Sequence, residues 1–188
     1  MPYYLLFIII LFFRKGGTCM FQEGDYIVYR NTGVCRVEKI GIPEDFAAAA
    51  QDVLYYHLAP VRGSGIIYIP VDSKVFMRGI ISKEEAMHLI ASIPSVEETP
   101  DYSKDQKALA EHYKCMLQTH DCAALIHLIK NIHRKSQELE ARGKTPGKTD
   151  VQYKKQAEIF LHEELSVVLG IPFEEIPSYI RKQVEAAM

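Results

Sequence analysis

The stretch that decides the fold is residues 21–40, which read FQEGDYIVYRNTGVCRVEKI. Residues 26–29 and 34–40 are rich in β-branched and aromatic side chains, a composition typical of strands. Between them lie Asn31, Thr32 and Gly33, and a Gly can adopt the positive φ angle that a tight turn needs. The stretch therefore predicts two strands joined by a tight turn.

The strand pattern continues after this stretch as far as residue 76. A break at 41–43 and a loop with four alanines at 47–50 precede a third strand at 53–58. A turn with two glycines follows at 62–65, then a strand at 66–70 and a short fifth one at 71–76. Short strands at this spacing predict a small, strongly bent antiparallel barrel over residues 20–80.

From residue 82 the pattern becomes helical. Ser82 and Glu85 form a capping box for a short helix, and the polar segment EETPDYS at 97–103 predicts a hinge, so residues 81–102 are a helix and hinge. Helices are expected at 104–118, at 122–141 with Asp121 as cap, after a cap at Thr149 or Asp150, and at 172–183. The fold class is α+β: a β barrel followed by an all-α helical bundle at 103–188.

The first 19 residues do not fit this plan. Residues 3–13, YYLLFIIILFF, are too short to span a bilayer, and no basic residue precedes them as in a secretory signal. The following RKGG at 14–17 is what a ribosome-binding site would encode if it were translated, and Met20 lies at a workable distance. We expect the protein to start at Met20, with residues 1–19 a mis-assigned extension; a membrane anchor is the alternative.

Composition excludes several classes of protein. The 188 residues are 48% hydrophobic and 24% charged, too apolar for a disordered chain. The net charge is −2, which argues against a protein that coats nucleic acid throughout. Four scattered cysteines, at 19, 35, 115 and 122, do not form a secreted disulfide scaffold. Reduced thiols in the cytoplasm are therefore expected.

Motifs for chemistry are weak. GKTPGKT at 143–149 has three residues where a phosphate-binding P-loop has four, and it joins two helices. His112, Cys115, His120 and Cys122 are spaced unlike any structural zinc site. The acidic pairs at 163–164 and 174–175 are expected to be solvated. We therefore expect no enzyme activity, no metal or cofactor, and no small-molecule substrate.

Charge is unevenly distributed along the second half of the chain. Residues 130–155 contain eight basic and three acidic side chains, whereas residues 156–188 contain two basic and six acidic ones. A basic helix end and loop beside an acidic tail is typical of a local phosphate contact. Charge alone fits a solvated surface equally well.

The N-terminal pattern F-x-x-G-D-x-[IV]-V-Y-x-x-x-G-V, from Phe21 to Val34, resembles the CarD family of bacterial RNA polymerase-binding regulators. Tyr55 and Tyr56, the run at 68–71 and Arg78 with Gly79 extend the resemblance. The same module occurs in transcription-repair coupling factors, but helicase motifs are absent from this sequence. The helical half looks like that of the clostridial or bacillar branch of the family.

This resemblance implies a transcription regulator whose Tudor-like barrel binds the β subunit of RNA polymerase. Its helical domain would contact promoter DNA, without reading sequence, near the upstream edge of the melted region, and so stabilise the open complex. For the polymerase contact we predict an exposed strand edge: Ile66, Ile67, Tyr68, Ile69 and Pro70. For DNA phosphates we predict Lys104, Lys107, Arg134, Lys135, Lys144 and Lys148.

Family members commonly place a Trp after the hinge, where it wedges into the minor groove, but this chain has no Trp. Tyr102 is the nearest aromatic residue in register and is the candidate wedge. The missing Trp favours an alternative, a protein-interaction module on RNA polymerase that does not bind DNA.

Overall fold

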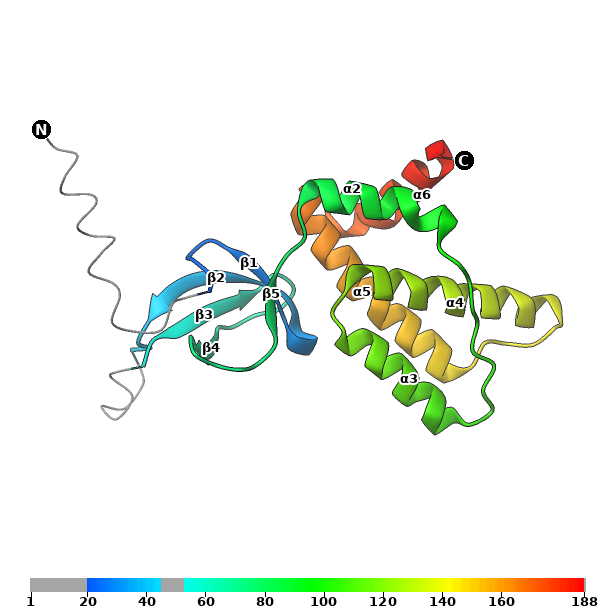
Figure 1. Cartoon of the computed structure of the whole chain (residues 1–188), viewed down its shortest axis with the longest axis horizontal. Helices are drawn as coiled ribbons and strands as arrows, with labels where there is room; N and C mark the ends of the chain where they lie inside the picture. Colours follow the sequence, from blue (N-terminus) through cyan, green and yellow to red (C-terminus); the bar gives the residue numbers. More distant parts are fainter. Residues whose placement is uncertain (1–19, 45–52, 188) are drawn as a thin grey trace, which may run out of the picture.

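The computed structural model describes residues 20–44 and 53–187. The expected leader at 1–19 and the loop at 47–50 lie outside these residues. In the described part, an antiparallel five-stranded sheet precedes five α-helices, so the protein belongs to the α+β class (Figure 1). No helix within these ranges has both the length and the apolar character needed to cross a membrane.

The sheet has the strand order β4-β3-β2-β1-β5. Its strands are β1 (Tyr26–Tyr29), β2 (Gly33–Gly41), β3 (Tyr55–Pro60), β4 (Ile67–Pro70) and β5 (Met77–Gly79). The predicted turn between the first two strands is a short 3-10 segment, η1 (Arg30–Thr32). The prediction of a fifth strand at 71–76 is wrong, because the N–H of Ser73 donates to the carbonyl of Pro70 at 3.0 Å and turns the chain there, and β5 follows only at Met77.

The sequence predicted a barrel, but the described strands form an open sheet. β4 and β5 are its two edges, and β5 pairs with β1 over three residues before the chain leaves for the helices. A bulge between Val37 and Lys39 interrupts the pairing of β2 with β3. Alternate side chains of β1, β2 and β3 meet on one face and form a cluster with Phe21: Ile27, Tyr29, Cys35, Val37, Tyr56 and Leu58.

The helices are α2 (Lys83–Ser92), α3 (Gln106–Gln118), α4 (Cys122–Ala141), α5 (Lys148–Leu169) and α6 (Ile176–Ala187). Short 3-10 segments η3 (Ile93–Ser95) and η4 (Phe173–Glu175) follow α2 and precede α6. The predicted capping box of Ser82 and Glu85 is confirmed, as is the cap at Asp121. The predicted cap at Thr149 or Asp150 is wrong, because α5 starts earlier and Gly147 occupies the N-cap position.

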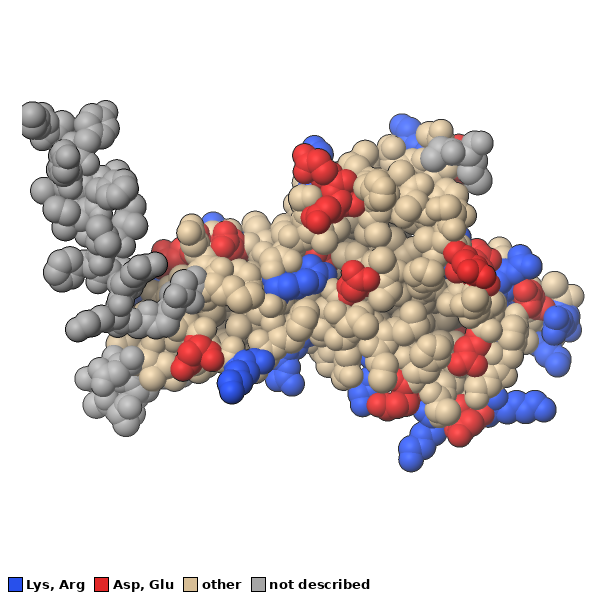
Figure 2. Space-filling model, viewed as in Figure 1, with Lys and Arg blue, Asp and Glu red and all other residues tan. Residues whose placement is uncertain are grey.

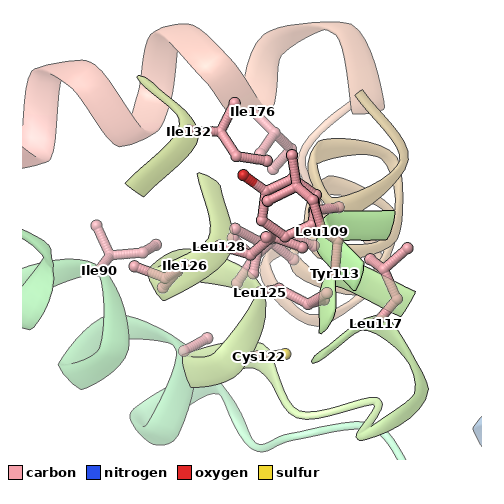
Figure 3. Close-up of a cluster of buried hydrophobic side chains, with 14 residues drawn as sticks. Ile90, Leu109, Tyr113, Leu117, Cys122, Leu125, Ile126, Leu128, Ile132 and Ile176 are labelled. Atoms are coloured by element: carbon pink, nitrogen blue, oxygen red, sulfur yellow. The ribbon is translucent and has the colours of Figure 1, made fainter. Parts of the chain in front are cut away.

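A second buried cluster holds the helices together (Figure 3). It includes Ala86 and Ile90 from α2, together with Leu109 of α3, Leu128 of α4 and Leu165 of α5. Helices on both sides of the polar segment 97–103 therefore pack into the same core. The domain boundaries expected from the sequence stay a prediction.

The sheet and the helices meet at one end of each (Figure 1). The start of β2 contacts α5, and β5 leads directly into the segment before α2. Val28 and Val34 are buried away from the cluster of the sheet and line a small cavity together with Leu125 and Phe160 of the helices.

Candidate interaction surfaces

The strand that was predicted to form an exposed edge, β4, lies at one edge of the sheet. Within the described residues β4 pairs with β3 and ends the strand order. Ile67 and Ile69 pack against the cluster of the sheet, whereas Ile66 and Tyr68 are 43% and 38% exposed. Tyr68 also contacts His57 edge-on, with ring centroids 4.8 Å apart. Two large apolar side chains at this edge therefore reach solvent, where a partner could contact them.

Five of the six predicted phosphate contacts are exposed, and a hydrogen bond joins two of the segments that carry them. Lys104, Lys107, Arg134, Lys144 and Lys148 all reach solvent. The Thr149 hydroxyl donates to Gln106 Oε1 at 3.2 Å, which joins the start of α5 to the start of α3. Figure 2 shows Lys and Arg side chains where α4 ends and α5 begins and near the start of α3, with acidic side chains among them. We call this region the basic end.

Tyr102 lies at the basic end and is 47% exposed. Its hydroxyl donates a hydrogen bond to Glu138, whose other carboxylate oxygen accepts from Arg134 Nε at 2.9 Å. The hydrogen bond from Tyr102, with help from Arg134, lowers the pKa of Glu138. A candidate wedge, a cation and a carboxylate are therefore linked on one surface.

The structure corrects the prediction for Lys135. This side chain is 6% exposed, and its ammonium forms an ion pair with Asp150 at 2.9 Å. The Tyr113 hydroxyl donates to the same carboxylate oxygen at 2.9 Å. A buried charge must be paired, so the ammonium is committed to the interior and does not reach a phosphate in this conformation.

The basic surface differs from the one the sequence count suggested. Lys130 also turns inward, where its ammonium donates to the carbonyls of Ile93 and Val96 at 2.9 and 2.8 Å. Conversely, Lys154 and Lys155 were not selected from the sequence, yet they line a groove of about 640 Å³ between α4 and α5. The sequence could have indicated these two residues, because they lie within the basic segment 130–155.

The junction between sheet and helices is charged, and the sequence did not predict it. Glu163 and Glu164 of α5 are each 2% exposed, so the expectation that this pair is solvated is wrong. Arg78 of β5 binds both oxygens of Glu164, at 2.5 and 2.7 Å, and also donates to the carbonyl of His120. The burial of Glu164 could have been predicted from its position, because it follows Leu161 by three residues and so lies on the apolar face of α5.

The four zinc candidates have other partners or lie on the surface. His112 pairs with Asp101 at 3.1 Å, Cys115 is exposed, and His120 stacks on Phe76. The thiol of Cys122 donates to Glu164 Oε2 at 3.2 Å. Among the described residues, His, Cys, Asp and Glu side chains do not gather in threes that could hold a metal ion.

Comparison with known proteins addresses the N-terminal part. Residues 21–81 match the family profile described as the CarD-like/TRCF RID domain. No curated protein sequence matches the chain. The matched residues comprise the sheet and the segment that leads into α2. Residues 21–81 therefore form a CarD-like/TRCF RID domain.

Proposed function

We propose that this protein is a non-enzymatic, CarD-like bacterial transcription regulator that acts on RNA polymerase in the cytoplasm. The match of residues 21–81 to an RNA polymerase-interacting domain carries the proposal. We assign the β subunit as the polymerase partner and take the sheet as the counterpart of a Tudor-like barrel. The assignment to the clostridial or bacillar branch rests on the sequence motifs.

The polymerase contact is assigned to the β4 edge. Strand addition supplies backbone hydrogen bonds, and alternate side chains supply specificity. Ile66 and Tyr68 are the residues to test, because Ile67 packs against the cluster of the sheet and its replacement would disturb folding.

The experiment measures the Kd of the full chain for the polymerase β subunit. Tyr68→Asp and Ile66→Asp should each weaken binding at least about tenfold, as expected for a central apolar contact. Val151→Asp, at an exposed apolar residue of α5, is the matched control and should leave the Kd unchanged. Unchanged binding in both edge variants, with native circular dichroism, would show that the edge is wrongly chosen.

The helical part is assigned to promoter DNA near the upstream edge of the melted region. The support is the basic end, which carries exposed cations from three helices and from the two loops before α3 and α5. Each phosphate contact contributes about −0.9 to the slope of log affinity against log salt. Arg134→Glu and Lys148→Glu should flatten this slope on any DNA sequence, whereas Lys182→Glu on α6 should not.

The wedge is assigned to Tyr102. An inserted ring stabilises an unstacked base step, and stacking depends little on salt. Tyr102→Ala should shorten the lifetime of the open complex with little change in affinity for duplex DNA, and Tyr102→Trp should lengthen it. An unaltered lifetime in Tyr102→Ala would reduce the DNA role to tethering.

The alternative is a protein-interaction module on RNA polymerase that does not bind DNA. The absence of Trp from the sequence and the presence of Glu138 beside Tyr102 favour it. A chain that binds polymerase but shows no salt-dependent affinity for duplex or forked DNA would establish this alternative.

A further inference from the structure

Glu163 occupies an unusual position between α5 and the sheet. It is 2% exposed, and its Oε1 has no hydrogen-bond partner among the described residues. Its Oε2 lies so close to Gly33, at the start of β2, that a Cβ at that glycine would collide with it. A buried carboxyl group in such a place is stable when it carries a proton and costly when it is charged.

The neighbouring groups compensate a charge on Glu163 only in part. The adjacent Glu164 is committed to Arg78 and to the N–H of Ile81, which donates to its Oε1 at 3.0 Å. Arg62, in the turn between β3 and β4, is the facing cation, but its guanidinium also stacks 3.6 Å above the ring of Phe173. The thiol of Cys35 faces the carboxyl from β2.

The pKa of Glu163 is raised to about 7 as the net result of several causes. Burial raises it most, hydrogen bonds from the backbone of Val34 and Arg62 and the charge of Arg62 lower it, and the charge of Glu164 raises it. Burial and the charge of Glu163 also raise the pKa of the Cys35 thiol to about 12, so the thiol stays neutral. The protonated form of Glu163 therefore matches its site, and ionisation favours any motion that exposes the carboxylate to water.

We propose that Glu163 is a positioning residue that controls the junction between the polymerase-interacting sheet and the helical part: the protonated carboxyl keeps α5 against β2, and ionisation loosens the contact. The angle between the β4 edge and the basic end then depends on pH. This inference goes beyond the proposed function, and its test needs neither polymerase nor DNA.

The sign of the effect follows from linkage. A carboxyl whose pKa is raised by folding stabilises the closed junction fully below its ordinary pKa of 4.5, and this stabilisation is lost as pH rises to about 7. Burial lowers the pKa of His120 and His162. Their contribution is lost as pH falls and therefore has the opposite sign.

The test is amide hydrogen exchange of Ile81 in the full chain, because its N–H binds Glu164 across the junction. In the native protein the protection factor, corrected for intrinsic rates, should fall by up to about tenfold per pH unit between pH 5 and 7 and then level off. In Glu163→Gln, which cannot ionise, it should no longer fall. Glu174→Gln, at an exposed carboxylate beyond α5, should behave as the native protein.

A parallel fall of Ile81 protection in the native protein and in Glu163→Gln would overturn the proposal. A second measurement covers the case in which the variant does not fold. The carboxyl carbon of Glu163, labelled with carbon-13 in the native chain, should titrate with a midpoint of about 7. A midpoint near the ordinary value of 4.5 would also overturn the proposal.

Discussion

At the residue scale, Gly33 is required both by the local backbone conformation and by a side chain that is distant in the sequence. Its φ of 93° is accessible to glycine, and a Cβ would collide with Glu163. Gly24 has the same φ, but nothing lies within 4 Å of a Cβ there. Alanine at either position should cost about 1–3 kcal/mol of backbone strain. Gly33→Ala should lower the free energy of unfolding by roughly 1–3 kcal/mol more, because the added methyl group overpacks against Glu163. Urea unfolding measures both variants. Equal losses of stability would show that the Glu163 side chain moves aside without cost.

Neighbouring cations at 134 and 135 have different roles. Lys135→Ala leaves Asp150 buried without its cation and should lower the free energy of unfolding by about 3–5 kcal/mol. Arg134→Ala breaks an exposed ion pair and should cost less than about 1 kcal/mol. Urea unfolding of the two variants compares them directly. Equal destabilisation would mean that the pair of Lys135 and Asp150 does not form in the native protein.

At the scale of the element, the first turn of α4 is fixed by one side chain. The side chain of Asp121 accepts a hydrogen bond from the N–H of Ala124 at 2.9 Å. The preceding residue, His120, accepts a hydrogen bond from Arg78 through its carbonyl. Asp121→Ala should therefore lower the free energy of unfolding by about 0.5–2 kcal/mol. Asp121→Asn retains the cap and should be close to neutral. Thermal unfolding measures both, and an equal loss in the asparagine variant would point to charge rather than capping.

At the scale of the whole molecule, Arg78 and Glu164 join two buried clusters that belong to different parts of the chain. Arg78→Ala leaves Glu164 buried without its cation, so the sheet and the helices should lose cooperativity and unfold in two steps. Differential scanning calorimetry should then give a van't Hoff enthalpy below the calorimetric one. Arg36→Ala, which breaks an exposed pair within β2, is the control and should keep a single transition.

Local features were predictable because their causes lie within a few residues. The strands at 26–29 and 66–70, the capping box at Ser82 and the stop at Gly170 depend on backbone preferences and on hydrogen bonds that span three or four positions. The expectation that β4 is an edge was also confirmed. Three of the exposed cations, Arg134, Lys144 and Lys148, were predictable from the cluster of basic residues between positions 130 and 155.

The sequence by itself therefore determined the order and type of the elements and the general location of the basic end. The tertiary structure alone decided that the sheet is open, that Lys135 faces Asp150, and that Glu163 and Glu164 are buried. The physical reason is that burial of a charged side chain depends on a partner that folding supplies. Arg78 and Glu164 are 86 positions apart in the chain, and no local pattern around either residue encodes their contact.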